Sequence, residues 1–389
     1  MTASGLDRHG SEGRAPSCPH RPPCPGCPRY GEPGISTASR SALEALAHLH
    51  GLTDLPVVSG ATSAFRLRAR LAIRGRQGAP KIGMFQLDSH RVVPIPDCSV
   101  QHPLINRVAA VVRRALVDAA VTPYSEVPHV GLARYLQVVV ERGSQSAQVV
   151  LVANTPTVEP LAACLDLIRA RLGDELHSLW FSAHCERSNT ILGPECVNWC
   201  GPASVVERFG GAAVHYPPGA FGQNNLDIAE RIVEHVRAEV PENALVAEFY
   251  AGVGAIGLSL LPRVREVRMN EVGPHSLHGM ALGIAALDAA DRARVRVVQG
   301  LAGEAIAVAS GADVVIADPP RRGLDRGLLE CLIQEPPELF LYVSCGLESF
   351  VEDTARLTSG GRLRLTGLTA FNLMPFTEHV ETVARFERA

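Results

Sequence analysis

The stretch ALVAEFYAGVGAIG, residues 244–257, decides the fold of this chain. An apolar run typical of a buried strand leads directly into a G-x-G-x-x-G pattern. Glycines at a strand-to-helix junction allow a tight turn and let a ligand approach the backbone. The next strand-like run ends in Glu271, whose carboxylate can bind ribose hydroxyls. The pattern fits NAD enzymes and enzymes that use S-adenosylmethionine (SAM) alike, and a turn made only for helix packing is the remaining alternative.

Strands and helices alternate from this turn towards the C-terminus. The segment 274–290 has helical spacing and lies between two strand-like runs. Alternation of this kind predicts a parallel sheet covered by helices on both faces, and therefore an α/β, Rossmann-like fold. The strand-like runs are 244–250, 264–271, 293–299, 312–318 and 339–344, followed by 361–371 and 379–388.

Two chemically useful residues stand where later strands end. Asp318 closes ADVVIAD, and Cys345 directly follows LFLYVS. Ligands of open α/β sheets bind at the carboxyl ends of the strands, so both residues should face the crevice of the glycine turn. Hydride transfer has no need of a cysteine there, whereas a cysteine beside a methyl donor suggests covalent activation of the methyl acceptor. A small buried hydrophobic residue is the alternative interpretation of an isolated cysteine.

Three closely spaced cysteines near the N-terminus indicate a metal site. Cys18, Cys24 and Cys27 form C-x5-C-x2-C in a proline-rich loop. Taken by itself, this spacing favours zinc, with His20 as a possible fourth ligand.

Length and charge limit the possible classes of protein. The 389 residues suggest two or three domains. A net charge of −3 excludes a globally basic wrapper of nucleic acid, although not a local basic patch. No apolar run approaches the roughly 20 residues that span a membrane, and residues 1–17 lack the apolar core of a signal peptide. We therefore expect a cytoplasmic protein without a membrane partner.

Five motifs occur in one order along the last part of the chain. They are FGQNN (221–225), EFYAGVGAIG (248–257), DPPRRGL (318–324), YVSC (342–345) and FNLMPFTEHVETV (371–383). Together they resemble the RNA uracil-C5 methyltransferase family, SAM-dependent enzymes that make 5-methyluridine. YVSC with HVETV is highly specific, and the likeness covers nearly the whole chain after residue 17. The chain most resembles the shorter, iron–sulfur-containing 23S rRNA (uracil-5-)-methyltransferases.

The resemblance implies a role for each matching residue. Cys345 is expected to be the nucleophile that adds to C6 of uracil, and Glu381 the base that removes the C5 proton. The residues expected to bind SAM are Gln223, Tyr250, Gly252, Gly254, Glu271 and Asp318. Phe221 and Asn225 complete the F-x-Q-x-N pattern, and Arg322 is expected near RNA phosphate.

The resemblance also changes the expected metal. Several relatives carry C-x5-C-x2-C with one distant cysteine and hold a [4Fe-4S] cluster. Cys98 matches that fourth position, so Cys18, Cys24, Cys27 and Cys98 are the expected ligands, with zinc as the alternative.

The sequence departs from the family pattern at three places. Ala255 stands where relatives often have Asn, and Gly300 where they have Asn or Asp. Gly346-Leu347 replaces the Asn-Pro that often follows the cysteine. The first two changes remove polar contacts to SAM, and the third touches the loop that shapes the nucleophile.

An arginine-rich strand is expected to contribute to RNA binding. In residues 64–76, apolar residues alternate with arginines, which predicts one apolar face and one basic face. We expect the basic face to contact RNA phosphates, with a merely solvated face as the alternative. The arginines concerned are Arg66, Arg68, Arg70, Arg74 and Arg76.

These observations combine into a four-part organisation. The expected parts are a disordered tail (1–17), a Cys-rich loop with a helix (18–59), an α+β RNA-binding domain (60–210) and a SAM-dependent catalytic domain (211–389). The expected partner is RNA, 23S rRNA in preference to tRNA, and no obligate protein partner is evident. The alternatives from other classes are a non-catalytic RNA-binding relative and an NAD-dependent oxidoreductase.

Overall fold

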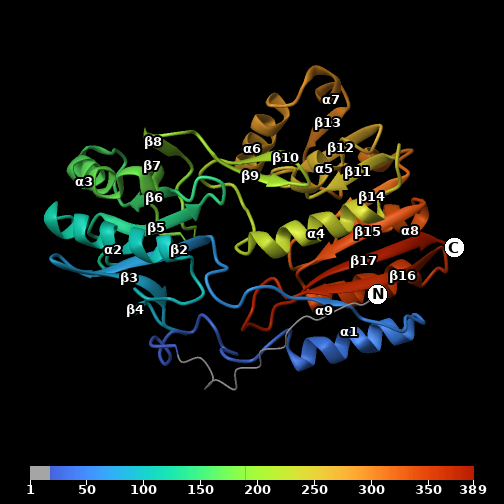
Figure 1. The fold of residues 1–389 in the computed structure, drawn as a ribbon, viewed down its shortest axis with the longest axis horizontal. Helices are drawn as coiled ribbons and strands as arrows, with labels where there is room; N and C mark the ends of the chain where they lie inside the picture. Colours follow the sequence, from blue (N-terminus) through green and yellow to red (C-terminus); the bar gives the residue numbers. More distant parts are fainter. Residues whose placement is uncertain (1–17, 189) are drawn as a thin grey trace, which may run out of the picture.

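The computed structural model describes residues 18–188 and 190–389. The tail expected over residues 1–17 lies outside the described residues. Two lobes stand side by side, one built on a seven-stranded sheet and the other on an eight-stranded sheet (Figure 1). Within the part of the chain that is described, no helix is both long enough and apolar enough to cross a membrane.

The eight-stranded sheet carries the glycine turn. Strands β11 to β15 in it are parallel, and β17 runs antiparallel between β15 and β16. In sheet order its strands are β1 (Val57–Val58), β16 (Leu363–Phe371), β17 (Glu381–Arg388), β15 (Leu339–Ser344), β14 (Val314–Ala317), β11 (Leu245–Phe249), β12 (Glu266–Glu271) and β13 (Val295–Gln299).

The other lobe is a mostly antiparallel sheet. Its strand order is β4 (Val92–Pro94), β3 (Ala79–Phe85), β2 (Arg68–Arg76), β5 (Ala133–Val140), β6 (Ala147–Ala153), β7 (Leu176–Ala183) and β8 (Cys196–Cys200). A two-stranded ribbon, β9 (Val205–Phe209) and β10 (Ala212–Tyr216), follows it in the chain.

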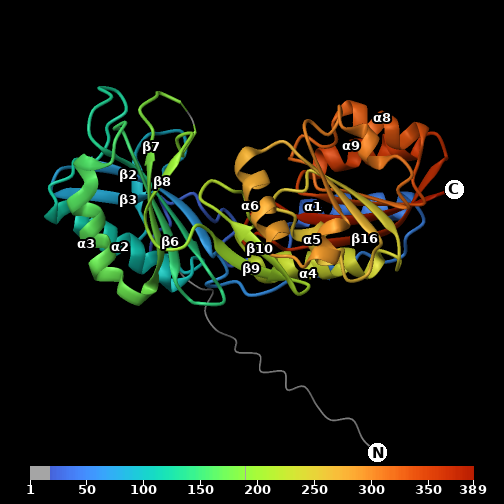
Figure 2. The ribbon, with the colours of Figure 1, turned by 90° about the horizontal axis from the view of Figure 1, so that it is seen from above.

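Helices cover both faces of the eight-stranded sheet, as the alternation predicts (Figure 2). One face packs against α4, α5 and α6, and the other against α1, α8 and α9. Strands β14 and β15 are buried along their whole length, which explains their nearly continuous apolar sequence. The α-helices are α1 (Thr37–Leu49), α2 (Pro103–Asp118), α3 (Ala162–Leu172), α4 (Leu226–Glu239), α5 (Ala255–Leu260), α6 (Pro274–Ala285), α7 (Ala289–Ala293), α8 (Arg326–Gln334) and α9 (Leu347–Thr358), and three 3₁₀ turns span Glu159–Leu161, Gly173–Glu175 and Ile306–Ala309.

The helical segment 274–290 is interrupted. Helix α6 ends at Ala285, and α7 starts after Asp288, whose side chain accepts a hydrogen bond from the amide of Asp291. This N-cap satisfies a free amide of the new helix and explains the break.

The arginine face predicted on β2 is wrong in part. Arg68 is buried with its guanidinium 4.1 Å from the Tyr216 ring centroid. Arg74 is also buried, where it pairs with Glu126 and donates to the carbonyl of Arg134. Both faces of β2 are therefore covered at these positions. Arg70 and Arg76 are exposed and Arg66 is half-buried, so the continuous basic face does not exist.

Candidate active site

Cys345 and Glu381 lie at the ends of two adjacent antiparallel strands. Ser344 of β15 pairs with Thr382 of β17. Cys345 follows Ser344 and Glu381 precedes Thr382, so the register places the thiol and the carboxyl across from each other. The Thr382 hydroxyl donates to the Ser344 carbonyl at 3.4 Å and reinforces this end of the ladder.

Asp318 joins this pair from the next strand. Ala317 of β14 lies beside Tyr342 of β15, and the Asp318 amide donates to the carbonyl of Phe249 on β11 at 3.4 Å. Asp318 therefore stands between the strand of the glycine turn and the strand of the cysteine. The carboxyl-end argument correctly predicted that Asp318 and Cys345 share one edge of the sheet.

Each of these groups changes the electrostatic environment of the others. Burial, and after it the charges of Glu381 and Asp318, raise the pKa of Cys345 to about 11, while Arg321 acts in the opposite direction. Burial and the Asp318 charge hold the pKa of Glu381 well above its ordinary value, and Arg321 opposes them. Burial also raises the pKa of Asp318 to about 7. The site therefore combines a thiol and two protonatable carboxyls with one cation.

The glycine turn is tied to the end of β12 by Glu271. One carboxylate oxygen accepts from the Gly252 amide at 2.7 Å, and the other accepts from the amides of Val272 and Gly273 at 2.9 and 2.6 Å. Gly254 has a φ of 84° and caps the start of α5, a conformation that favours glycine. Glu271 thus fixes the turn at the carboxyl edge of the sheet. Val272 and Leu301, which lie just beyond the ends of β12 and β13, are exposed.

Two more residues of the expected site lie around the same edge. The Tyr250 hydroxyl accepts a hydrogen bond from the amide of Asp325 at 2.9 Å. Gln223 is half-buried in the loop between β10 and α4. In that loop Asn225 caps α4 and donates to the carbonyl of Leu373 at 3.2 Å. The FGQNN loop is therefore attached to the loop that precedes Glu381.

Comparisons with known proteins agree with this geometry. The family described as tRNA (Uracil-5-)-methyltransferase matches residues 210–389. An RNA methyltransferase of Protochlamydia amoebophila is 34% identical over 384 residues, covering 96% of this chain and 98% of that relative. The chain belongs to the RNA uracil-C5 methyltransferase family. Another RNA methyltransferase, from Gloeobacter violaceus, is 29% identical over 95% of this chain and 84% of its own length.

A solved structure shares the fold of this methyltransferase. The tRNA (uracil-54, C5)-methyltransferase of Pyrococcus abyssi, in complex with S-adenosyl-L-homocysteine, has a TM-score of 0.72 and 22% identity. The structural match covers 89% of this chain and 82% of the Pyrococcus abyssi chain. By its family, the methyltransferase described here is a SAM-dependent enzyme that acts on uracil C5 in RNA.

Two residues of this methyltransferase's site were missed by sequence reasoning. Arg321 lowers the pKa of both Cys345 and Glu381 and is the cation next to the thiol. Arg321 directly follows DPP in the DPPRRGL motif, and this position next to Asp318 could have identified it from the sequence. Glu248 is buried below the glycine turn, where burial raises its pKa to about 8. An acidic residue inside the otherwise apolar run ALVAEFY was the feature of the sequence that could have identified Glu248.

The structure gives a reason for one departure from the family pattern. A Cβ atom at Gly346 would lie 2.4 Å from the carbonyl oxygen of Arg321. Glycine at this position therefore lets the turn after Cys345 pack closely against the DPPRR segment.

The four cysteines expected to bind a cluster come together. Cys18, Cys24, Cys27 and Cys98 line one cavity, and Arg66 lies in its wall. Burial raises the pKa of Cys27 to about 11 and also raises that of Cys98. Within residues 18–188 and 190–389, however, no group of three or more His, Cys, Asp or Glu side chains is placed to hold a metal ion.

Proposed function

We propose that this enzyme methylates C5 of a uridine in 23S rRNA through a covalent bond between Cys345 and C6 of the base. The observation that carries the proposal is the register of β15 and β17, which sets the Cys345 thiol opposite the Glu381 carboxyl beside Asp318. A nucleophile and a base at one edge are what this reaction needs, because C5 of uracil is a poor nucleophile until a group adds at C6.

Each residue has a defined part in the reaction. The Cys345 thiol releases its proton to solvent, and its sulfur forms a bond to C6, which moves the C5–C6 π electrons towards C5. C5 would then take the methyl group of the donor, whose sulfur would keep the electron pair of the broken carbon–sulfur bond. Glu381 then removes the C5 proton, and the returning electron pair re-forms the C5–C6 double bond and expels the Cys345 thiolate. Arg321 favours the ionised form of the thiol because it lowers the pKa of Cys345.

The glycine turn and its surroundings fit the methyl donor. SAM supplies an electrophilic methyl group when it is bound. The Glu271 oxygen that accepts from Gly252 keeps one acceptor site for a ribose hydroxyl. The exposed side chains of Val272 and Leu301 offer apolar surface at the same edge of the sheet. The residues that we assign to SAM binding are Gln223, Tyr250, Gly252, Gly254, Glu271 and Asp318.

We also assign Cys18, Cys24, Cys27 and Cys98 to a [4Fe-4S] cluster. Four thiols around one cavity suit such a cluster, and metal binding would deprotonate thiols whose pKa values are raised. The cluster would join the N-terminal loop to the segment around Cys98. His20 lines the same cavity, which keeps zinc as the alternative.

Metal analysis separates these assignments. Protein purified without oxygen should be brown and contain about four irons per chain, because four thiolates bind one cluster. Cys98→Ser should lose most of this iron, whereas Cys331→Ser, on α8, should retain it. One zinc per chain with no iron would contradict the assignment.

The domain organisation is part of the proposal. We assign residues 18–59 to the cysteine loop and its helix, 60–210 to RNA binding and 211–389 to catalysis. We also propose that the enzyme works in the cytoplasm. Arg70, Arg76 and Arg322 are exposed, and we assign them to RNA phosphates. Arg70 also donates to Gln137, and Arg322 also pairs with Asp325. A non-catalytic relative is disfavoured because the thiol and the buried carboxyl are both present and adjacent.

The choice of 23S rRNA is supported by the cysteine loop, and the family description favours tRNA as the second candidate. Purified enzyme with methyl-labelled SAM should form 5-methyluridine in an unmodified 23S rRNA transcript and about tenfold less in tRNA transcripts, a difference that one or two lost contacts would produce. The position is mapped by digestion and mass spectrometry. Methylation of tRNA alone would contradict this choice of substrate.

A further inference from the structure

The loop that precedes Glu381 has an unusual backbone. Residues 372–380 connect β16 to β17, and Glu381 is the first residue of β17. Phe376 in this loop has a φ of 66°, in the left-handed region that side chains other than glycine rarely adopt. Such a conformation persists only where surrounding contacts impose it.

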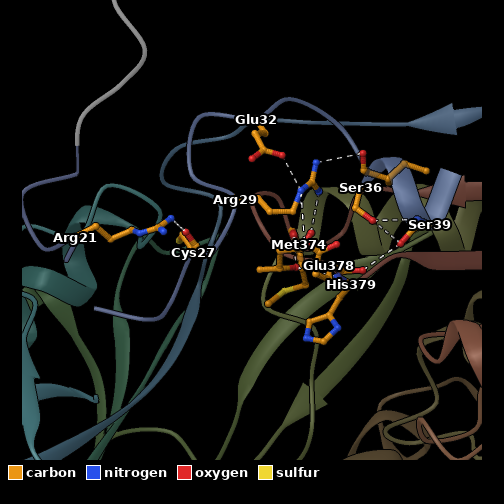
Figure 3. A network of polar contacts seen from close by, with 11 residues as sticks. Arg21, Cys27, Arg29, Glu32, Ser36, Ser39, Met374, Glu378 and His379 are labelled. Atoms are coloured by element: carbon orange, nitrogen blue, oxygen red, sulfur yellow. Dashed lines mark hydrogen bonds and ion pairs between the residues drawn. The ribbon is translucent and has the colours of Figure 1, made fainter. Parts of the chain in front are cut away.

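Arg29 provides several of these contacts from the N-terminal segment. Its backbone amide donates to the Phe376 carbonyl at 3.0 Å, and its guanidinium donates to the Thr377 carbonyl at 3.1 Å. The same guanidinium lies 3.7 Å from a carboxylate oxygen of Glu378. Figure 3 shows the Arg29 side chain inserted between its own segment and this loop. Because the Arg29 side chain is only 11% exposed, its hydrogen bond to the Thr377 carbonyl is partly shielded from water, whereas Glu378 is exposed.

Neighbouring residues strengthen the same attachment. The Tyr30 ring lies 4.9 Å from the Phe376 ring, centroid to centroid. The Ser39 hydroxyl donates to the carbonyl of Glu378 at 3.3 Å, within the network of Figure 3. The other side of the loop is held by Asn225, which donates to the carbonyl of Leu373. The loop is therefore fixed between the N-terminal segment and the FGQNN loop.

We propose that Arg29 is a positioning residue that holds the Glu381 carboxyl in line with C5 of the methylated base. This inference rests on the proposed function, in which Glu381 removes the C5 proton. Among the described residues, the polar partners of Arg29 are Phe376, Thr377 and Glu378 in the loop and Glu32 and Ile35 in its own segment. Arg29 therefore influences Glu381 through the loop and not by direct contact. Its loss should impair proton removal while leaving the earlier attack by Cys345 and the methyl transfer intact.

Arg29→Ala is tested in single turnover with RNA tritiated at C5 and SAM labelled with carbon-14 in its methyl group. Transfer of the methyl label to RNA should match wild type. Tritium release should slow by about tenfold, since small misplacements of a catalytic group cost one to two orders of magnitude. The denatured complex should then carry both labels. Arg29→Lys, which keeps one charged donor, should recover part of the rate.

Arg40→Ala is the matched control, because Arg40 is an exposed arginine of α1 whose ion-pair partner is Glu44. It should release tritium at the wild-type rate. Arg29→Ala should also keep wild-type SAM affinity and iron content. Its thermal unfolding temperature should fall, because the loop loses buried hydrogen bonds. If Arg29→Ala does not fold, tritium release and methyl transfer by Arg29→Lys are compared with those of wild type and Arg40→Ala.

Two results would overturn the inference. One is tritium release at the wild-type rate in the Arg29 variants while Glu381→Gln retains tritium. The other is an equal loss of SAM binding, methyl transfer and tritium release, which would mean a merely structural role. Failure of the proposed function is distinguishable, because wild type itself would then release no tritium.

Discussion

Cys345→Ala should abolish 5-methyluridine formation, lowering the rate by about 10⁴-fold or more, the scale of losing a catalytic nucleophile. In the proposed reaction this thiol forms the bond to C6. The thiol is half-buried at the end of β15, so its loss leaves a small gap and does not remove a core contact. SAM binding should remain within twofold of wild type, as measured by calorimetry, while methyl transfer to RNA disappears.

Cys331→Ala provides the matched control for this experiment. Cys331 is also half-buried, but it lies on α8. Its variant should methylate RNA at the wild-type rate. Wild-type turnover by Cys345→Ala would contradict covalent catalysis by this residue.

Glu381→Gln should trap the reaction after methyl transfer. The amide cannot accept the C5 proton, so turnover should fall by about 10² to 10⁴-fold, and a protein–RNA complex that survives denaturation should accumulate. Attack by the thiol should not be slowed. The Glu381 charge raises the pKa of Cys345, and its removal therefore increases the thiolate fraction at a given pH.

The trapped complex is measured by denaturing gel electrophoresis with labelled RNA. Glu348→Gln, an exposed substitution in the first turn of α9, should behave as wild type. Normal turnover without a trapped complex in Glu381→Gln would show that another group removes the proton.

Sequence periodicity predicted the catalytic lobe well because its central strands β11, β14 and β15 are buried on both faces. Such strands appear as continuous apolar runs, and their carboxyl ends mark the site without any knowledge of side-chain positions. The position of Asp318 and Cys345 at one edge of the sheet was therefore predicted from the residues alone. Glu381 was assigned only through the family resemblance, because its approach to Cys345 depends on the antiparallel register of β17.

The environment of β2 could not be predicted in the same way. Alternation separates the two faces of a strand, but it does not reveal what covers the second face. Arg68 is covered by Tyr216, and Arg74 by Tyr124 and Tyr135, all distant in sequence. The contacts of Arg29 with the loop before Glu381 were likewise hidden, because they join opposite ends of the chain.

The central claim is that the Cys345 sulfur carries the methylated uridine. Glu381→Gln is incubated with RNA and methyl-labelled SAM, digested with nuclease and trypsin, and analysed by mass spectrometry. The account predicts one modified peptide, containing Cys345 and increased in mass by a nucleotide that bears the transferred methyl group. Attachment of that nucleotide to a different cysteine, or free 5-methyluridine with no modified peptide, would contradict it.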